Sequence, residues 1–509
     1  MNQSILLSLL IFSPVLGILL LAFIPKAQEK TIKLVGFLST LLPLAVSMII
    51  YIQYLLGKKL SSFAERYEWI QIGNFEEIIR DRVFAIDYEL GIDGFALVLL
   101  LLTTVIATLA SIASIHIKKE WKGYFMLFLL LELGMLGVFA AQNLILFFIF
   151  FELTLIPMFF LIGKWGYFER EKAAYSYLIY NGLGSAVLLI VIIVLFARTG
   201  TTNIALLSDF ISGNVPPEKI LLPITPEIRW GLFIGLLVAF GVKLPIFPLH
   251  SWMLKVHVQA PPSVVMLHSG ILLKIGAFGL IRFGAGLFPE EFVKISVVLA
   301  VLGVINLLYG AFLAFIQDDF KMVLAYSSIS HMGIVLIGLA ALNEAGIQGA
   351  IFQVVSHGLI SALLFFLVGV MYERTNTTIL GNLGGLSKVM PLTAGFFLAG
   401  AMASLGLPGM SGFVSEFMAF LGLFKEMPII AAIGTIGIIM TAVYLLRAVL
   451  SMTFGPLNEK MTEVTDMKKV ELVPVLVLVG LIVLIGVYPD VLTGPLKSTV
   501  EAMMLGIGG

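Results

Sequence analysis

Long runs of apolar residues, separated by short polar breaks, occupy most of this 509-residue chain. A helix that spans a bilayer needs about 20 such residues. Cutting the chain at its polar breaks predicts about fourteen membrane-spanning helices, and no strand stands out from this pattern. Their approximate ranges are 3–24, 31–55, 90–115, 124–141, 143–163, 174–198, 229–249, 262–283, 293–316, 322–342, 348–371, 391–422, 427–454 and 471–489. The pattern therefore indicates an all-α polytopic membrane protein.

Composition supports a chain that lies in a lipid bilayer. Hydrophobic residues make up 60% and charged residues 12%, with a mean hydropathy of +1.07. A soluble domain is about a quarter charged, so these values exclude an ordinary water-facing surface and also intrinsic disorder. Lys plus Arg equals Asp plus Glu at 31 each, so no net charge points to nucleic acid. The first apolar run lacks the marks of a cleaved signal, and we expect it to be a membrane helix.

Two longer loops, at 57–89 and 199–228, carry the Pro, Asn and charged residues expected outside the membrane. Only a short tail, 489–509, is expected after the last helix. Lys and Arg gather in the loops that follow odd-numbered helices, and such loops face the cytoplasm. Both the N-terminus and the C-terminus are therefore predicted on the non-cytoplasmic side.

Two of the predicted helices are interrupted by proline and glycine. The seventh contains the sequence GVKLPIFP at 241–248, and the twelfth contains SLGLPGMSG at 404–412. Paired interrupted helices in inverted halves are typical of transporter working sites. We expect inverted repeats of helices four to eight and nine to thirteen, which divides the chain into four regions: 1–123, 124–283, 284–454 and 455–509.

A small set of ionisable residues lies inside the predicted helices. Each charged side chain at mid-bilayer costs about 2.5–3.5 kcal/mol on insertion scales, which argues for function. Their distances from the helix ends place all of them near the midplane; Glu132 and Glu152, for example, lie ten residues either side of Gln142, about 15 Å along a helix. The set comprises Glu132, Glu152, Lys243, Lys274, His331, His357 and Glu416.

A layer of carboxylates, amines and imidazoles at one depth is suited to passing protons from group to group. We expect Glu152 to pair with Lys243, followed by Lys274, then His331 and His357, and finally Glu416. Glu132 has a competing interpretation as a clamp between helices.

Other polar residues favour structural roles. His250 and His268 lie near helix starts, where they would satisfy the local backbone or face the interface, and Arg447 would pair with a carboxylate. The His spacing predicts no metal site, and the absence of Cys excludes Cys-ligated iron–sulfur clusters in this chain. The glycines at 381–385 have no strand before them, so a nucleotide site is not expected. We predict no cofactor, metal or catalytic residue in this chain.

Several strings of residues carry a resemblance to a known family. The chain resembles the antiporter-like membrane subunits of bacterial NADH-quinone oxidoreductase (respiratory complex I), and among them the M or chain 4 type, over about residues 85–455. The matching strings are GIDGFALVLLLLT (91–103), LELGMLGVF (131–139), FELTLIPMFFLIGKWG (151–166), AFGVKLPIFPLHSWM (239–253), HSGILLKIGAFGLIRF (268–283), DDFKMVLAYSSISHMG (318–333) and LGLPGMSGFVSEF (405–417).

The resemblance implies roles for single residues. Glu152 matches the family's glutamate on helix five, and Lys243 and Lys274 match its lysines on helices seven and eight. His331 and His357 match relay or gating histidines, and Glu132 matches a further glutamate on helix four. Glu416 matches the terminal acidic group of helix twelve, where other family types carry lysine. That residue and the short tail, which the L type extends into a long lateral helix, favour the M type.

The function implied is that of a proton-translocating membrane-arm subunit, driven by quinone reduction elsewhere in the complex. NADH, FMN, iron–sulfur clusters and quinone would belong to partner subunits, and L-type and N-type subunits would flank this chain in a bacterial inner (plasma) membrane.

Three alternatives stay open. A subunit of a multisubunit Na⁺/H⁺ antiporter shares most of the motifs, and Glu416 is the residue that discriminates it. The membrane arm of a hydrogenase or formate complex is a related case. A structural scaffold, whose charges only hold helices together, is disfavoured by the midplane layer.

Overall fold

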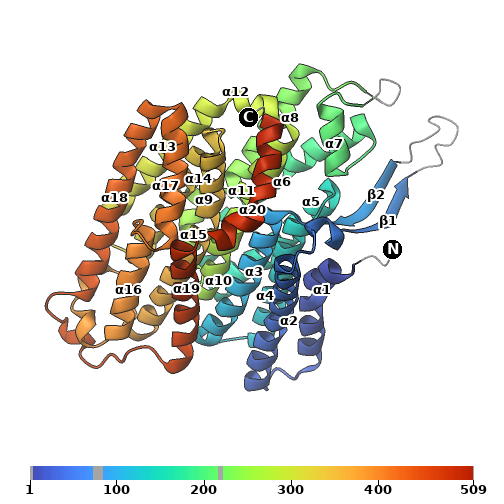
Figure 1. The fold of residues 1–509 in the computed structure, drawn as a ribbon. Helices are drawn as coiled ribbons and strands as arrows, with labels where there is room; N and C mark the ends of the chain where they lie inside the picture. Colours follow the sequence, from blue (N-terminus) through green and yellow to red (C-terminus); the bar gives the residue numbers. More distant parts are fainter. Residues whose placement is uncertain (1–3, 73–83, 216–221, 508–509) are drawn as a thin grey trace.

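Apolar helices that lie side by side form the body of the molecule (Figure 1). The computed structural model describes residues 4–72, 84–215 and 222–507. Within these residues, twelve helices are long and apolar enough to cross a membrane. The all-α polytopic fold is therefore confirmed. The first residue of the first predicted span, the two chain ends and parts of both predicted long loops lie outside the described residues.

The twelve helices follow the predicted apolar runs closely. They are α1 (Leu6–Phe23), α2 (Glu29–Leu55), α3 (Gly94–Ala113) with the short turn η2 (Ser114–His116), α4 (Trp121–Ala140), α5 (Leu144–Trp165), α6 (Arg170–Thr199), the continuous helix Pro262–Ala285, α13 (Ser296–Phe315), α14 (Phe320–Ala340), α15 (Glu344–Thr375), α18 (Pro428–Thr453) and α19 (Lys469–Val487).

The helix Pro262–Ala285 changes its winding along its length. It consists of α10 (Pro262–Leu267), η4 (His268–Leu272), α11 (Leu273–Gly279) and η5 (Leu280–Ala285), of which η4 and η5 are π-helical. Short π-helical segments in proteins frequently mark functional positions. Lys274 lies directly after the first of them.

Both predicted interruptions are present. The seventh span is divided into α8 (Pro226–Lys243) and α9 (Ser251–Gln259), and the twelfth into α16 (Pro391–Ser404) and α17 (Ser411–Glu426). The residues between α16 and α17 include Gly406 and Gly409, whose φ values of +81° and +92° suit glycine. The inverted repeats and the four-region division remain predictions.

Five elements differ from the sequence-based expectation. Strands β1 (Glu65–Ile72) and β2 (Phe84–Leu90) form an antiparallel hairpin in the first long loop, where no strand was expected. Helix α20 (Asp490–Ile507) replaces the expected tail, and α7 (Ile204–Ile211) and α12 (Pro289–Lys294) are also additional. The sequence analysis missed the hairpin because it searched for long apolar runs, and a short strand with alternating polar and aromatic residues contains none.

Short 3₁₀ turns complete the secondary structure. They are η1 (Leu60–Phe63), η6 (Leu380–Asn382), η7 (Leu386–Lys388) and η8 (Glu459–Met461). Polar residues begin several helices by accepting a bond from a free backbone N–H. The carboxylate of Asp93 accepts from Ala96 N at 2.8 Å before α3, and the Asn143 amide accepts from Ile145 N at 2.9 Å before α5.

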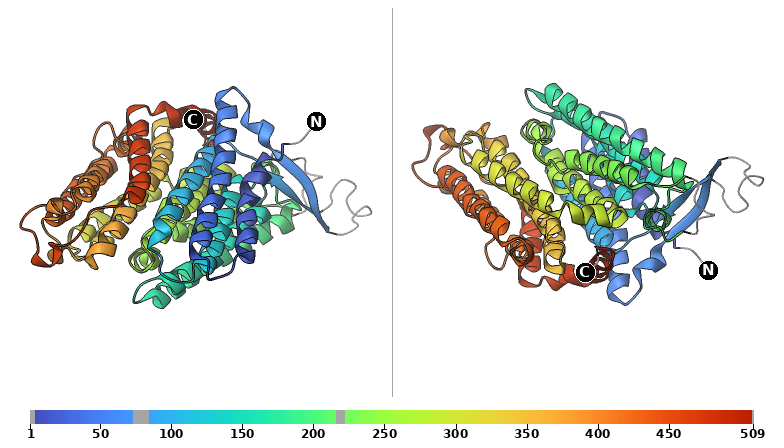
Figure 2. Two further views of the ribbon diagram at one scale, coloured as in Figure 1. Left: turned by 90° about the horizontal axis from the view of Figure 1, so that it is seen from below. Right: turned by 90° about the horizontal axis from the view of Figure 1, so that it is seen from above.

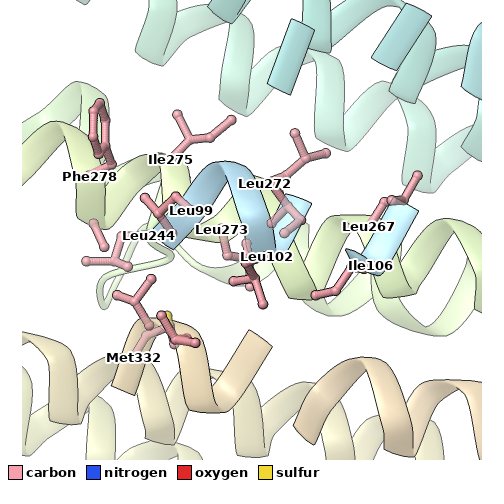
Figure 3. Close-up of a cluster of buried hydrophobic side chains, with 14 of the residues drawn as sticks. Leu99, Leu102, Ile106, Leu244, Leu267, Leu272, Leu273, Ile275, Phe278 and Met332 are labelled. Carbon is pink, nitrogen blue, oxygen red and sulfur yellow. The ribbon is translucent and has the colours of Figure 1, made fainter. Parts of the chain in front are cut away.

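The helices form two groups that meet along α3, α10 and α15. Figure 2 shows the blue-to-green helices beside the yellow-to-orange ones, with the red C-terminal helices crossing between them. Apolar side chains fill the junction: Figure 3 shows Leu99 and Leu102 of α3, Leu273 of α11 and Met332 of α14 near one another with Leu244. Leu244, Leu273 and Met332 are chain neighbours of Lys243, Lys274 and His331, so this apolar packing lies next to buried ionisable residues.

Candidate functional site

The predicted site residues lie inside the helical body. Lys243, Lys274, His331, His357, Glu416 and Glu132 are buried, and Glu152 is half-buried. Burying so many ionisable groups is unfavourable unless they interact with one another or serve a function. The contacts described next show which of them the fold brings together.

Lys274 and the two predicted histidines form a connected cluster from three helices. The Lys274 ammonium on α11 lies 2.6 Å from His357 Nδ1 on α15. The His357 ring packs beside the His331 ring of α14, with centroids 5.4 Å apart. The second half of the predicted order, from Lys274 through the histidines, is thus a set of direct neighbours.

The cluster continues to Glu416 at the second helix break. His331 Nδ1 lies 3.6 Å from a carboxylate oxygen of Glu416 and 3.0 Å from Gln353 Nε2. His331 Nε2 lies 3.0 Å from the hydroxyl of Ser404, the last residue of α16. A β-carbon at Gly406 would lie 2.7 Å from the Glu416 carboxylate, so the glycine in the break makes room for it.

Lys243 has few polar neighbours at the first break. Its ammonium lies 3.5 Å from the Tyr177 hydroxyl and 5.1 Å from the centre of the Phe151 ring. Glu152 is close enough for its charge to act on Lys243 and Tyr177, but no ion pair joins Glu152 and Lys243 in the part of the chain that the structure describes. The aromatic rings next to the ammonium take the place of the expected direct carboxylate contact.

Two buried histidines form a contact that the sequence analysis missed. His257 Nε2 on α9 lies 2.9 Å from His268 Nδ1, and neither side chain is exposed to solvent. The His268 ring also packs against the Tyr177 ring at 5.9 Å. Because the Tyr177 hydroxyl lies 3.5 Å from the Lys243 ammonium, the histidine pair reaches the surroundings of Lys243 through this ring.

The expected role of His268, with the local backbone or the interface, is wrong. Its partner is an imidazole from the preceding helix in a fully buried position. The sequence did contain one indication of this contact. The two histidines lie on either side of residues 260–262, where α9 ends and α10 begins, and the turn there brings their rings together. His250 likewise bonds a side chain, the Tyr309 hydroxyl at 3.1 Å.

Glu132 stands apart from these contacts. Its side chain is completely buried on α4, and neither carboxyl oxygen has a hydrogen-bond partner among the described residues. The clamp interpretation, which needs a bonded partner on another helix, gains no support from this geometry.

Two further expectations can be compared with the structure. Arg447 forms an ion pair with Asp318 at 3.7 Å, as predicted. Over residues 4–72, 84–215 and 222–507 no group of three His, Asp or Glu side chains is arranged to hold a metal ion.

Known proteins are similar in sequence to this chain over almost its full length. The family described as "NADH:quinone oxidoreductase/Mrp antiporter, TM" matches residues 141–441. The chain belongs to this family. Family members similar to it include NADH-quinone oxidoreductase subunit M of Rickettsia prowazekii, 34% identical over 98% of each chain. The NAD(P)H-quinone oxidoreductase chain 4 of Gloeobacter violaceus is 37% identical over 98% of this chain and 92% of its own.

Several solved structures share the fold. A chain of respiratory complex I from Thermus thermophilus has a TM-score of 0.83 and 29% identity, covering 99% of this chain and 100% of its own. A chain of an archaeal membrane-bound sulfane sulfur reductase has a TM-score of 0.84 and 25% identity, covering 96% and 77%. A chain of the Mrp complex from Dietzia sp. DQ12-45-1b has a TM-score of 0.83 at 21% identity over 100% of both chains, which shows the fold alone. The resemblance found in the sequence is confirmed.

Proposed function

We propose that this chain is a proton-translocating subunit of the membrane arm of an NADH:quinone oxidoreductase. The observation that carries the proposal is the buried chain of contacts from Lys274 through His357 and His331 to Glu416. These residues come from four helices, and each can bind or release a proton. The curated relatives named as subunit M or chain 4 of such oxidoreductases support this assignment.

The relay runs in two stages. In the first stage, Glu152 and Lys243 interact through the field of their charges, and the His257–His268 pair packs against Tyr177, whose hydroxyl lies 3.5 Å from the Lys243 ammonium. In the second stage, a proton on Lys274 is 2.6 Å from an imidazole nitrogen that can accept it. A change of charge at one group alters the preferred protonation of the next, which passes the signal along the layer. Glu132 remains a candidate at the outer end of this layer.

Electron transfer takes place in other chains of the complex. The chain has no Cys, so it supplies no thiolate ligand for an iron–sulfur cluster. NADH, FMN, iron–sulfur clusters and quinone belong to partner subunits, and L-type and N-type antiporter-like subunits flank this one. We place the chain in a bacterial inner membrane with both termini on the non-cytoplasmic side, opposite the Lys- and Arg-rich loops. The two broken helices support inverted repeats of helices four to eight and nine to thirteen.

The test is made on the complete membrane complex, purified through a tag on this chain and placed in lipid vesicles. We expect it to oxidise NADH and to acidify or alkalise the vesicle lumen. Lys243→Ala or Glu152→Gln should reduce NADH-driven pumping by about tenfold, the effect of 1.4 kcal/mol on a rate, while the complex still assembles. Lys255→Ala removes an exposed lysine of α9 and is the matched control.

Two results would contradict the proposal. Normal pumping by both assembled variants would remove Glu152 and Lys243 from the relay. Co-purification with small membrane subunits only, combined with Na⁺/H⁺ exchange that needs no NADH, would make the chain part of an antiporter.

A further inference from the structure

The first helix break is held by a residue from the other half of the chain. Where a membrane helix is interrupted, its backbone groups need new partners because lipid supplies none. The Asn306 side chain of α13 provides two: its oxygen accepts from Phe247 N at 2.8 Å, and its nitrogen donates to the Pro245 carbonyl at 3.2 Å. Asn306 is fully buried, so water does not compete for these bonds.

A second residue of α13 holds the far end of the same break. Tyr309 lies one turn after Asn306, and its hydroxyl is 3.1 Å from His250 Nε2. The Tyr309 ring also packs against the Phe247 ring at 5.1 Å. Two residues of α13 thus contact the segment between Lys243 and α9, at Pro245, Phe247 and His250.

Helices α13 and α14 are packed backbone to backbone. A β-carbon at Gly333 would lie 2.5 Å from the Gly303 carbonyl oxygen, and one at Gly310 would lie 2.6 Å from Ser330 N. The Ser330 hydroxyl donates to the Leu307 carbonyl at 2.9 Å across the same interface. Close contact through small residues leaves no free volume for the helices to slide past each other. The α13–α14 pair therefore acts as one rigid unit.

The opposite side of this unit binds the second break. His331 belongs to α14, and its Nε2 lies 3.0 Å from the Ser404 hydroxyl at the end of α16. Its other nitrogen lies 3.6 Å from Glu416, at the start of α17. One rigid pair of helices consequently binds both interrupted helices, through Asn306 on one side and His331 on the other.

We propose that Asn306 is a positioning residue that couples the two helix breaks. A displacement of the segment around Pro245, caused by a change of charge at Lys243, moves Asn306 and with it the α13–α14 pair. His331 then changes its distance from Glu416 and Ser404. The inference rests on the proposed function, because it describes how an event at Lys243 reaches the end of the relay without a proton crossing every group between.

The test compares Asn306→Ala with Asn343→Ala in the complete complex in vesicles. Asn343 is a matched control because it also accepts from one backbone N–H (Gly346, 2.9 Å) and donates to one carbonyl (Gly422, 2.9 Å) between two helices. It lies directly before the first residue of α15, and its printed hydrogen bonds go to neither break. We expect NADH-driven pumping per assembled enzyme to fall about fivefold in Asn306→Ala, the lower end of typical coupling between sites, and to stay normal in Asn343→Ala.

A double substitution separates coupling from simple structural support. If the breaks are independent, the losses from Asn306→Ala and Ser404→Ala should multiply, as for distant sites in general. If α13 and α14 couple them, the double variant should pump about as well as the weaker single variant. Asn306→Asp keeps the size of the side chain and the acceptor for Phe247 N, but it sets an oxygen that cannot donate against the Pro245 carbonyl, so it should lose at least as much pumping as Asn306→Ala.

Each outcome decides the question. Unchanged pumping in Asn306→Ala, with pumping lost in Lys243→Ala, overturns the coupling and leaves the proposed function intact. Unchanged pumping in both Asn306→Ala and Lys243→Ala removes Lys243 from the relay and overturns the coupling with it, whereas Na⁺/H⁺ exchange that needs no NADH would overturn the proposed function. Multiplying losses, or loss of assembly in both Asn306 variants while Asn343→Ala assembles, would give Asn306 a purely structural role.

Discussion

The break after Lys243 and the break before Glu416 differ in what surrounds their charged groups. The Lys243 ammonium lies among aromatic rings and has one polar neighbour, the Tyr177 hydroxyl at 3.5 Å. Glu416 faces an imidazole at 3.6 Å, and that imidazole is bonded in turn to Gln353 and Ser404. The sequences of the two breaks are similar, with a Leu-Pro pair in each, but the side chains that surround the two charged groups differ.

The difference indicates two ways of transmitting a charge. An ammonium with few hydrogen bonds responds mainly to the field of nearby charges, which falls off gradually with distance. A carboxylate beside a hydrogen-bonded imidazole depends on geometry, because hydrogen bonds weaken steeply when donor and acceptor are misplaced. We therefore expect the first break to tolerate changes of shape that keep the charge, and the second to tolerate few changes of shape.

The largest effect is expected where the two halves meet. Lys274→Ala removes the 2.6 Å contact with His357, which is the first link of the connected cluster. NADH-driven pumping in vesicles should fall by at least about tenfold, a change worth 1.4 kcal/mol or more in the barrier. Lys425→Ala, which removes an exposed lysine of α17, is the control. Pumping within twofold of normal would show that the halves communicate by another route.

A pair of charge-preserving substitutions tests the comparison itself. Glu416→Asp keeps the carboxylate but withdraws it by one methylene from His331, now 3.6 Å away. Lys243→Arg keeps the positive charge among the Phe151 and Tyr177 rings, which do not require one fixed hydrogen-bond geometry. We expect Glu416→Asp to reduce pumping several-fold and Lys243→Arg to retain about half of it or more, since only the first loses a geometric contact. The reverse order in pumping assays would contradict the distinction between field and geometry.

Glu132 should matter less than the residues in contact. Its carboxyl oxygens have no partner among the described residues, so Glu132→Gln, of equal size, breaks no observed hydrogen bond. We expect pumping within about twofold of normal, the range of substitutions away from special features. A loss as large as that of Lys274→Ala would place Glu132 on the main route, with a partner that forms in another state of the protein.

The smallest effect concerns Glu89 in the hairpin, outside the membrane-spanning helices. Burial raises the pKa of Glu89, while Asn203, 2.7 Å from its carboxylate, and Arg66 oppose the rise. A raised pKa in the folded state means that the stability contributed by the protonated form is present at low pH and is lost as pH rises through the folded pKa. Glu89→Gln should therefore flatten the pH dependence of stability and change it at pH 7 by less than about 1 kcal/mol.

The measurement is thermal unfolding of the purified complex at pH 5 and pH 8. An Asn203→Ala variant is the companion, because it removes a partner that lowers the same pKa. A marked loss of stability at neutral pH in Glu89→Gln would show that the ionised carboxylate is needed by Arg66.

The sequence by itself determined the helices and their breaks, and it predicted the depth of the charged residues. Apolar length sets whether a helix crosses a membrane, and proline and glycine act on their own backbone, so both can be read locally. Position along a helix fixes depth at 1.5 Å per residue, which placed Lys274, His331 and Glu416 at one level. The resemblance to complex I subunits rested on the same local strings.

Only the tertiary structure decided which charged groups touch. Depth says nothing about rotation or about which helices are neighbours, so the sequence could not show that the Lys243 ammonium faces the Phe151 and Tyr177 rings, with no ion pair to Glu152 among the described residues. It also could not show that His257 meets His268, or that Asn306 binds a break 59 residues away. Each of these contacts depends on side chains from helices distant in sequence, whose approach is set by the packing of the whole bundle.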